Sequence, residues 1–276
     1  MEKLVVFVLF LALGIVLSCH SESQKSQTKD VSLLVQQYCG NCHHRPDPEI
    51  LPKTIWEEVV LPRMGYHLGI YPEVGFRQTL FEENEGGEIV EQAGLYPEEP
   101  LISNQEWDRI KTYYLSNAPE QLEMPDYPVM SELKDFELKI PNYAMSPPST
   151  TMIHIREEGG FYIGEANKRS LFQFDQRIEM VDQARLQEGP VDMLELRDQL
   201  LVQVMGSFSP TDEPSGFMVS LPKDKSKQAQ MIASRLQRPV DFSMDNLLGD
   251  ESPEFVFAEF GKWTGALSVF TMGPNG

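Results

Sequence analysis

The chain has 276 residues, enough for one large domain or two modest ones, each with its own core. It carries 23 Lys and Arg against 42 Asp and Glu, which gives a formal net charge of −19 at pH 7. We expect no nucleic-acid binding, because that function relies on Lys and Arg to displace counterions from phosphate. An acidic surface suits solubility or docking to a basic protein partner.

The N-terminal segment has the pattern of an export signal. Met1-Glu2-Lys3 precedes apolar or small residues from Leu4 to Leu17, a stretch too short to span a bilayer comfortably. Val16-Leu17-Ser18-Cys19 resembles the lipobox of bacterial lipoproteins. We predict a lipoprotein signal peptide over residues 1–19, a membrane anchor on lipidated Cys19, a polar tether over residues 20–30, and a periplasmic or cell-surface location. The alternative is an ordinary signal peptide or uncleaved anchor, with Cys19 a bystander.

The other two of the three cysteines, Cys39 and Cys42, are separated by only two residues. They cannot form a disulfide framework that closes long loops. Apolar residues at 31, 33, 34, 35 and 38 predict a short helix with Asp30 as its N-cap. The cysteine pair therefore falls at the C-terminal end of a helix, and His43 follows at once.

Three kinds of site compete for this motif. A thioredoxin-like redox pair needs a preceding strand and a following helix, but a helix precedes Cys39 and prolines follow His43. A zinc site needs two more ligands at regular spacing, and the other histidines are scattered along the chain (His20, His44, His67, His154). Covalent haem needs only two thiols and an adjacent imidazole. We therefore predict one haem c on Cys39 and Cys42, with His43 as proximal iron ligand and His44 as a surface neighbour.

A six-coordinate haem iron needs a second axial ligand, usually Met or His. Pro62 and Gly65 predict a loop that holds Met64 towards the iron, after a short helix that Thr54 could cap. Arg63 is a candidate contact for a haem propionate. The alternatives to Met64 are His67, a more distant methionine or an open position.

A second helix is predicted over residues 103–115. Ser103 and Glu106 form a capping-box pattern, and Trp107, Ile110 and Tyr114 fall on one face. With the haem motif and Met64, this helix makes residues 31–122 resemble a class I cytochrome c domain. The resemblance implies a small all-α domain that holds haem. Residues 71–99 carry eight glutamates and one basic residue, so we expect a solvated loop there, or a docking surface for a basic redox partner.

Beyond a proline-dotted linker at 123–149 the periodicity becomes β. Pro-Val-Asp occurs at 190–192 and again 49 residues later at 239–241. Short strands in units of 40–50 residues are typical of propeller blades. The predicted strands are Met152–Ile155, Phe161–Gly164, Ser170–Phe174, Pro190–Met193, Leu200–Val204, Gly216–Val219, Pro239–Phe242, Glu254–Ala258 and Gly265–Phe270.

The segments Val204–Phe208 and Ala258–Gly265 resemble strand and turn segments of the FG-GAP/VCBS-type propeller family. The chain thus resembles bacterial lipoproteins that join a cytochrome c domain to such a propeller. In that family a loop matching Asn246–Glu254 often binds calcium. Leu248 stands here where a polar ligand is expected, so we expect no calcium. Only about three blades fit into 150–276, fewer than a closed ring needs, which predicts a partial propeller in a truncated protein.

These observations predict an all-α cytochrome c-like domain followed by an all-β propeller-like domain, in an exported electron-transfer protein whose propeller docks a redox partner. One alternative is a haem-containing oxidoreductase that passes electrons from a substrate on the propeller to the haem. The other is a binding or adhesion propeller with an accessory haem. The β part shows no acid–base or nucleophilic constellation, and His154 is its only histidine. The oligomeric state is not predicted.

Overall fold

The computed structural model describes residues 31–123, 125–128, 135–143, 145–249 and 252–271. The predicted signal peptide, the lipidation site Cys19 and the predicted tether lie outside these residues. The chain divides into two compact units. The first comprises the described residues up to Arg77 together with Tyr96–Pro128, and the second comprises Gln78–Leu95 together with the described residues after Pro128.

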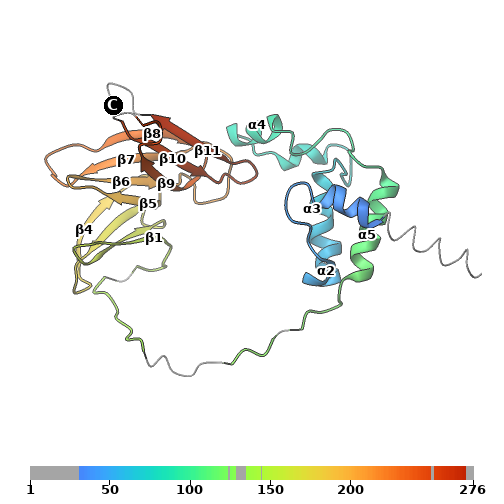
Figure 1. Ribbon diagram of the computed structural model, residues 1–276, viewed down its shortest axis with the longest axis horizontal. Helices are drawn as coiled ribbons and strands as arrows, with labels where there is room; N and C mark the ends of the chain where they lie inside the picture. Colours follow the sequence, from blue (N-terminus) through green and yellow to red (C-terminus); the bar gives the residue numbers. More distant parts are fainter. Residues whose placement is uncertain (1–30, 124, 129–134, 144, 250–251, 272–276) are drawn as a thin grey trace, which may run out of the picture. The chain divides into compact units, whose positions relative to one another are not determined.

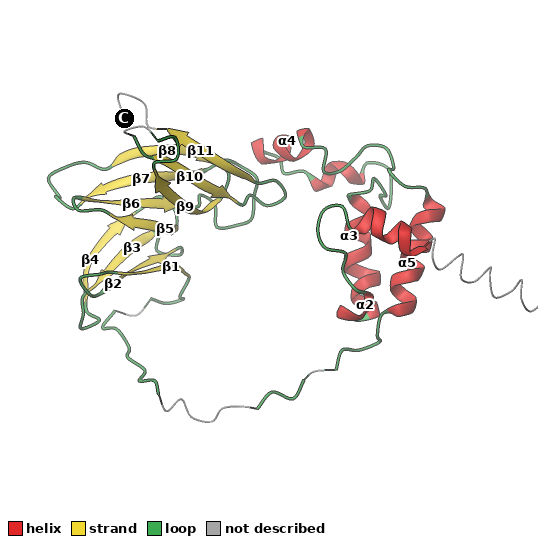
Figure 2. Cartoon of the chain, in the orientation of Figure 1, coloured by secondary structure: helices red, strands yellow, loops and turns green. Residues whose placement is uncertain are grey.

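The first unit is helical (Figure 2). Residues 31–39 form the helix that the apolar spacing predicts, and it ends at Cys39. The remaining elements are the 3₁₀ turn η1 (Pro48–Ile50), α2 (Lys53–Ile55), the π-helical turn η2 (Trp56–Val60), α3 (Leu61–Tyr66) and α5 (Asn104–Asn117). None of the helices in the described part of the chain is both long and apolar enough to cross a membrane.

Local capping explains where two of these elements begin. Asp47 Oδ1 accepts a hydrogen bond from the N–H of Glu49 at 3.2 Å, which starts η1. Ser103 and Glu106 form the predicted capping box at the start of α5. Thr54, in contrast, is no cap, because α2 begins after Pro52 without a side-chain cap. Since proline is tolerated in the first turn of a helix, Pro62 does not break α3, and the predicted loop around Met64 is helical.

The core of this unit is built around two indoles and the rings of α5. Trp56 and Tyr114 are almost fully buried, with ring centroids 4.5 Å apart. Trp56 Nε1 donates to the carbonyl of Pro48 at 2.8 Å, and the Tyr114 hydroxyl donates to that of Pro46 at 3.1 Å. These two bonds tie the segment that follows the cysteine motif to the core. The buried cluster is Leu34, Val35, Trp56, Leu61, Ile102, Trp107, Ile110 and Tyr114.

The second unit contains three antiparallel sheets, each a meander of consecutive strands (Figure 1). All nine predicted strands are present, and β4 and β8 are additional. The first sheet is β1 (Thr150–Ile155), β2 (Phe161–Glu165), β3 (Ser170–Phe174) and β4 (Met180–Arg185). The second is β5 (Pro190–Glu195), β6 (Gln199–Val204), β7 (Gly216–Pro222) and β8 (Gln230–Leu236). The third is β9 (Pro239–Asp245), β10 (Glu254–Glu259) and β11 (Ala266–Thr271).

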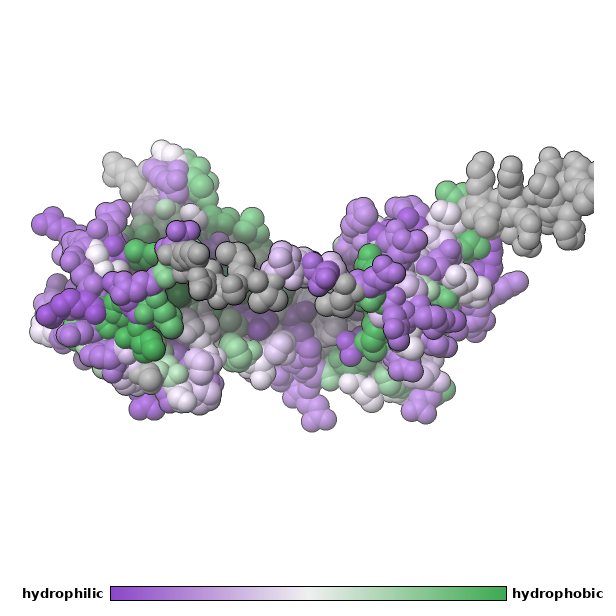
Figure 3. Space-filling model, turned by 90° about the horizontal axis from the view of Figure 1, so that it is seen from below, coloured by the Kyte–Doolittle hydropathy of each residue, from purple (hydrophilic) through white to green (hydrophobic). Residues whose placement is uncertain are grey.

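The middle sheet is buried on both faces. Val202 on one face belongs to a cluster shared with Tyr162 and Leu171 of the first sheet. Leu201 and Met218 on the other face belong to a cluster shared with the third sheet. This double burial explains why β6 reads as a nearly continuous apolar run. The outer sheets keep exposed apolar residues, such as Ile155 at 80% exposure, and Figure 3 shows apolar surface on the side of the first sheet.

The glutamate-rich segment Gln78–Leu95 belongs to the unit that contains the sheets. The 3₁₀ turn η3 (Phe76–Leu80) leads into it, and α4 (Glu85–Gln92) forms its centre. Asn84 caps α4 by accepting a hydrogen bond from the N–H of Gly87 at 3.2 Å. This segment is therefore ordered structure that packs against the sheets, and the expected solvated loop is replaced by a helix.

The predicted fold class is wrong. The chain is mostly β, with three antiparallel sheets and only short helices, and the predicted all-α cytochrome c-like domain is not evident in the residues that the structure describes. The described sheets form an open series and no closed barrel. The error arose because helical periodicity reports local burial, whereas the assignment of a domain depends on which segments pack together. Residues 78–95 pack with the sheets although they lie between helical segments in sequence.

Candidate functional site

The cysteine motif lies where the first helix ends. Gly40 closes the helix by donating its N–H to the carbonyl of Gln36 at 3.2 Å. A Cβ at position 40 would lie 2.6 Å from that oxygen, so the chain needs glycine there. Cys39 packs partly buried against the helical core, whereas Cys42 is exposed, and both thiols are free. The two sulfur atoms therefore come from one short segment, one at the core and one at the surface.

His43 is exposed next to Cys42. Its Nδ1 lies 2.8 Å from the backbone carbonyl of His44, so this nitrogen carries the proton and donates. The Nε2 lone pair is then available for a metal, as in most metal-bound histidines. A cavity of about 540 Å³ opens here and is lined by Gln36, Gly40, Asn41, Cys42, His43, His44 and Arg45. Of the two thiols and one imidazole that covalent haem needs, Cys42 and His43 line this cavity and Cys39 does not.

The electrostatics of Cys39 argue against a redox-active dithiol. Burial raises the pKa of the Cys39 thiol, and this effect outweighs the opposing effects of the Tyr114 hydroxyl and of Arg45. Burial and the neighbouring thiol also raise the pKa of Tyr114. Reactive cysteines of disulfide exchange have lowered pKa values, so Cys39 lacks the property that such chemistry requires. Arg45 is itself held by the Tyr113 hydroxyl at 3.2 Å.

The structure does not bring the predicted axial ligand Met64 to this cavity. Met64 lies on α3, partly buried against the helical core, and it is not among the residues that line the 540 Å³ cavity. Arg63, the candidate propionate contact, is exposed on the same helix. The alternative ligand His67 stacks on Tyr96 with ring centroids 4.9 Å apart. The sixth iron ligand therefore stays a prediction.

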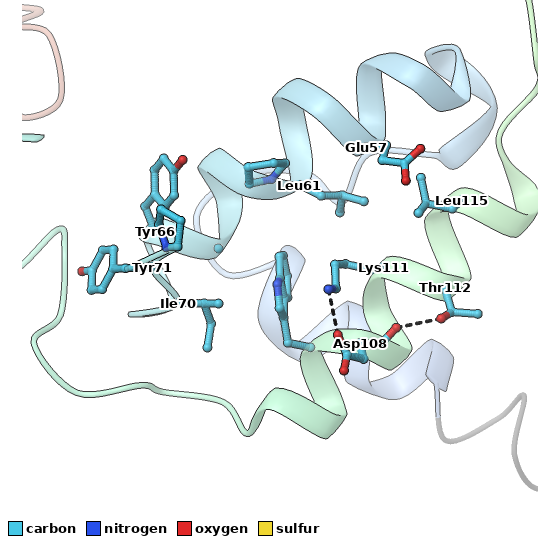
Figure 4. A pocket seen from close by; sticks show the side chains of 13 residues that line it. Glu57, Leu61, Tyr66, Ile70, Tyr71, Asp108, Lys111, Thr112 and Leu115 are labelled. Atoms are coloured by element: carbon cyan, nitrogen blue, oxygen red, sulfur yellow. Dashed lines mark hydrogen bonds and ion pairs between the residues drawn. The ribbon is translucent and has the colours of Figure 1, made fainter. Parts of the chain in front are cut away.

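A second cavity of the same unit lies between η2–α3 and α5 and has a volume of about 550 Å³ (Figure 4). Tyr66 and Tyr71 stand at one end with ring centroids 6.2 Å apart. The other end is polar, with Lys111 bound to Asp108 at 2.7 Å. Apolar and aromatic residues with a few polar groups are typical of small-molecule pockets of this size. The lining contains no cysteine or histidine: Glu57, Leu61, Pro62, Gly65, Tyr66, Ile70, Tyr71, Pro72, Trp107, Asp108, Lys111, Thr112 and Leu115.

The sheet unit contains buried carboxylates that the sequence did not single out. Asp212 is fully buried and accepts hydrogen bonds from the backbone N–H groups of Lys262 (3.1 Å), Trp263 (3.1 Å) and Thr264 (2.9 Å). Burial by itself would raise the pKa of Asp212, but these donors lower it. Asp212 therefore organises the turn between β10 and β11. Asp212 lies far from that turn in the sequence, and therefore no local sequence pattern predicted this contact.

Two further carboxylates did leave a signal in the sequence, since Asp192 and Asp241 are the aspartates of the two Pro-Val-Asp repeats. Burial, followed by the contact with Asp241, raises the pKa of Asp192 to about 6 despite two backbone hydrogen bonds. The repeat predicted strand starts, and both residues do lie on strands, β5 and β9. The sequence alone did not predict the raised pKa of Asp192, because that pKa depends on how the two strands pack.

In the segment that matches the calcium loop, a carboxylate oxygen accepts hydrogen bonds from the backbone. Glu254 Oε2 accepts hydrogen bonds from the N–H groups of Leu247 at 2.8 Å and Leu248 at 3.1 Å. Asp250 lies outside the described residues. Within the described ranges, no group of three or more His, Cys, Asp or Glu side chains is placed to hold a metal ion.

Comparison with models of protein families finds no match for the chain, and a search of curated proteins finds no relative. The geometry of the cysteine motif, with the chemistry of its side chains, is therefore the basis for assigning a function.

Proposed function

We propose that this chain is an exported c-type haem protein that transfers electrons. Cys39 and Cys42 bind the haem through thioether bonds, and His43 is the proximal iron ligand. The observation that carries this proposal is the arrangement at the end of helix 31–39, where His43 donates through Nδ1 to a backbone carbonyl and keeps Nε2 for a metal. Bound haem would supply a one-electron couple between Fe(III) and Fe(II).

Three features support haem over the two competing assignments. The raised pKa of Cys39 disfavours a redox dithiol. No described cluster of ligands completes a zinc site around the two cysteines. The thiols and the imidazole come from one segment of five residues, so haem attachment does not require the all-α cytochrome c fold, which is not evident in the described residues. The surface exposure of Cys42 and His43 leaves this segment accessible for attachment.

The remaining parts of the chain have proposed roles that follow from this one. Cys19 carries the lipid that tethers the protein to a bacterial membrane, and residues 20–30 separate the folded units from it. Met64 is the proposed second axial ligand, with Arg63 near a propionate. The sheet unit docks a redox protein partner. The overall charge of −19 favours a partner with a basic surface.

The test is expression of the whole chain in a bacterial host that exports proteins and attaches haem covalently. We expect one haem that stays on the protein in a denaturing gel and that responds in a reduced-minus-oxidised spectrum. C39S and C42S each remove one thioether and should shift the alkaline pyridine spectrum, and H43A should abolish stable haem. H44A is the matched control, because His44 is also exposed and lines the same cavity. A wild-type protein without covalent haem would contradict the proposal.

A further inference from the structure

A small cavity of the sheet unit lies where the first sheet meets the second, and its volume is about 190 Å³. Tyr162 of β2, Gln173 of β3 and Asp182 of β4 line it from the first sheet, and they are direct neighbours across these strands. Leu200 of β6 and Leu221 of β7 line it from the second sheet. At roughly 30 Å³ per water molecule the cavity has room for about six waters, so it suits a small ligand.

Three cationic side chains line this cavity, although the chain carries a net charge of −19. Arg156 directly follows β1, and Lys223 and Lys225 lie in the loop between β7 and β8. Of the described residues that line the cavity, only Asp182 is acidic. Cations thus gather here on an otherwise acidic chain, which provides charge complementarity for an anion.

Two of these cations share one carboxylate oxygen. Glu195 Oε1 accepts a hydrogen bond from Arg156 Nη2 at 3.1 Å and pairs with Lys223 Nζ at 2.9 Å. Glu158 also pairs with Arg156, at 3.4 Å, but its side chain is 86% exposed and water screens this pair. Since an ammonium group has three N–H donors, Lys223 keeps two donors without a partner among the described residues.

The second lysine of the loop also has donors to spare. Lys225 Nζ donates to Asp182 Oδ2 at 2.6 Å, which uses one of its three N–H groups. Asp182 lies on the first sheet, whereas Glu195, the partner of Lys223, lies on the second. The two ammonium groups are therefore anchored to acids of different sheets, and they present two separate positive charges at the cavity.

Two neutral side chains add further donors. The Tyr162 hydroxyl and the Gln173 amide have no hydrogen-bond partner among the residues that the structure describes, and both side chains line the cavity. Tyr162 is only 4% exposed. Its hydroxyl is not sealed in the core, because the sealed side-chain atoms that lack a partner in the described ranges are Arg238 Nε and Glu254 Oε1. Burial raises the pKa of Tyr162, so the hydroxyl stays protonated and can donate at neutral pH.

We propose that this cavity binds a small organic acid with two carboxylates on a short carbon skeleton. The carboxylates accept hydrogen bonds from Lys223 and Lys225, whose separate charges match two separate anionic groups. The Tyr162 hydroxyl donates to the same ligand and fixes its orientation. The carbon skeleton contacts Leu200 and Leu221, a contact that an inorganic anion does not use. The ligand thereby supplies the acceptors that the cavity lacks.

The experiment is isothermal titration calorimetry of the full chain with succinate, with succinamide as the uncharged analogue of the same skeleton. We expect saturable binding of succinate that weakens as salt screens the charges, and no binding of succinamide. Y162F removes one hydroxyl and keeps the ring, so its Kd should rise about three- to tenfold. K223M should raise the Kd about tenfold or more, because it removes a charged donor while Arg156 still pairs with Glu195.

K227M is the matched control, because Lys227 lies in the same loop but does not line the cavity. Its affinity for succinate should equal that of wild type. Urea unfolding checks that each variant is folded. If Y162F or K223M is unfolded, Q173L takes its place, because this substitution removes an unpartnered amide and leaves every ion pair intact. We expect Q173L to weaken succinate binding several-fold.

Four results would overturn the site. The first is a lack of saturable succinate binding at millimolar concentrations. The second is wild-type affinity in the folded cavity variants, which would place succinate elsewhere. The third is a loss in K227M as large as that in K223M, which would show general attraction to a basic loop. The fourth is binding of succinamide or inorganic phosphate as tight as that of succinate, which would show that no dicarboxylate is recognised.

Discussion

Lys262 donates through Nζ to the carboxylate of Glu82 at 2.8 Å, across 180 residues of sequence. The Thr211 hydroxyl donates to the other oxygen of the same carboxylate at 2.5 Å. Burial by itself would raise the pKa of Glu82, but the hydrogen bonds from Lys262 and Thr211 lower it. Glu82 thus attaches the segment before α4 to two loops of the sheets, and Glu85 adds an ion pair with Arg235 at 2.5 Å.

Replacing Lys262 by Met should loosen Gln78–Leu95 from the sheets. The side chains of Glu82 and Lys262 are only 24% and 30% exposed, so we expect a loss of about 1 kcal/mol, the upper end for such pairs. Because the pKa of Glu82 is lowered, the wild-type contact is fully present above the ordinary glutamate pKa and is lost as the pH falls through the lowered value. Hydrogen exchange of residues 78–95 measures the opening. K225M, which breaks the more exposed Lys225–Asp182 pair, should leave that segment unchanged.

Gly86 allows α4 to approach the sheets closely. A Cβ at this position would lie 2.5 Å from the backbone nitrogen of Glu213 and 2.8 Å from the carbonyl carbon of Asp212. Since both atoms belong to backbone, G86A should cost about 1–3 kcal/mol by overpacking, despite the better helix propensity of alanine. Urea unfolding monitored on the sheet unit tests this. E88A on the exposed side of α4 should be neutral or slightly stabilising, and equal stability of the two variants would refute the close approach.

Asp212 should be the most sensitive acid of the sheet unit. D212N keeps the volume and an amide oxygen in the place of Oδ1, but it puts an NH2 group where Oδ2 accepts from the N–H of Trp263, and it removes the charge, so we expect a loss of about 1–3 kcal/mol. The lowered pKa of Asp212 means that its contribution is present above pH 3.8 and is lost as the pH falls through the lower folded value. The acid limb of the stability profile should therefore flatten in D212N. An unchanged acid limb in D212N would show that other carboxylates cause the loss of stability at low pH.

Met64 provides the test of the second axial ligand. If Met64 binds the iron, M64A should abolish the thioether-to-iron charge-transfer band of the oxidised protein while the haem stays covalently bound. H67A should keep the band, because His67 stacks on Tyr96 in this structure. Persistence of the band in M64A would exclude Met64. Met64 packs against the helical core from α3, so α3 would have to rearrange for Met64 to bind the iron.

Features that depend on near neighbours in sequence were predicted well. The capping box of α5, the burial of Trp107, Ile110 and Tyr114, and the helix that ends at Cys39 follow from spacing alone. The strands with strong apolar runs were also found. The outer strands β4 and β8 were missed, because each sits at the edge of its sheet and carries many polar residues. Charged residues in and beside these two strands obscure the alternation of apolar and polar residues that predicts a strand.

By itself, the sequence determined the chemistry of the chain: two thiols and an imidazole on one segment, a net charge of −19, and two Pro-Val-Asp repeats 49 residues apart. Only the tertiary structure decided which segments meet. It packed the glutamate-rich segment on the sheets, overturned the all-α domain, and brought Asp192 to the Phe242 amide. Local spacing encodes burial and capping because those act within a few residues, whereas contacts across 50 to 180 residues depend on the packing of whole elements.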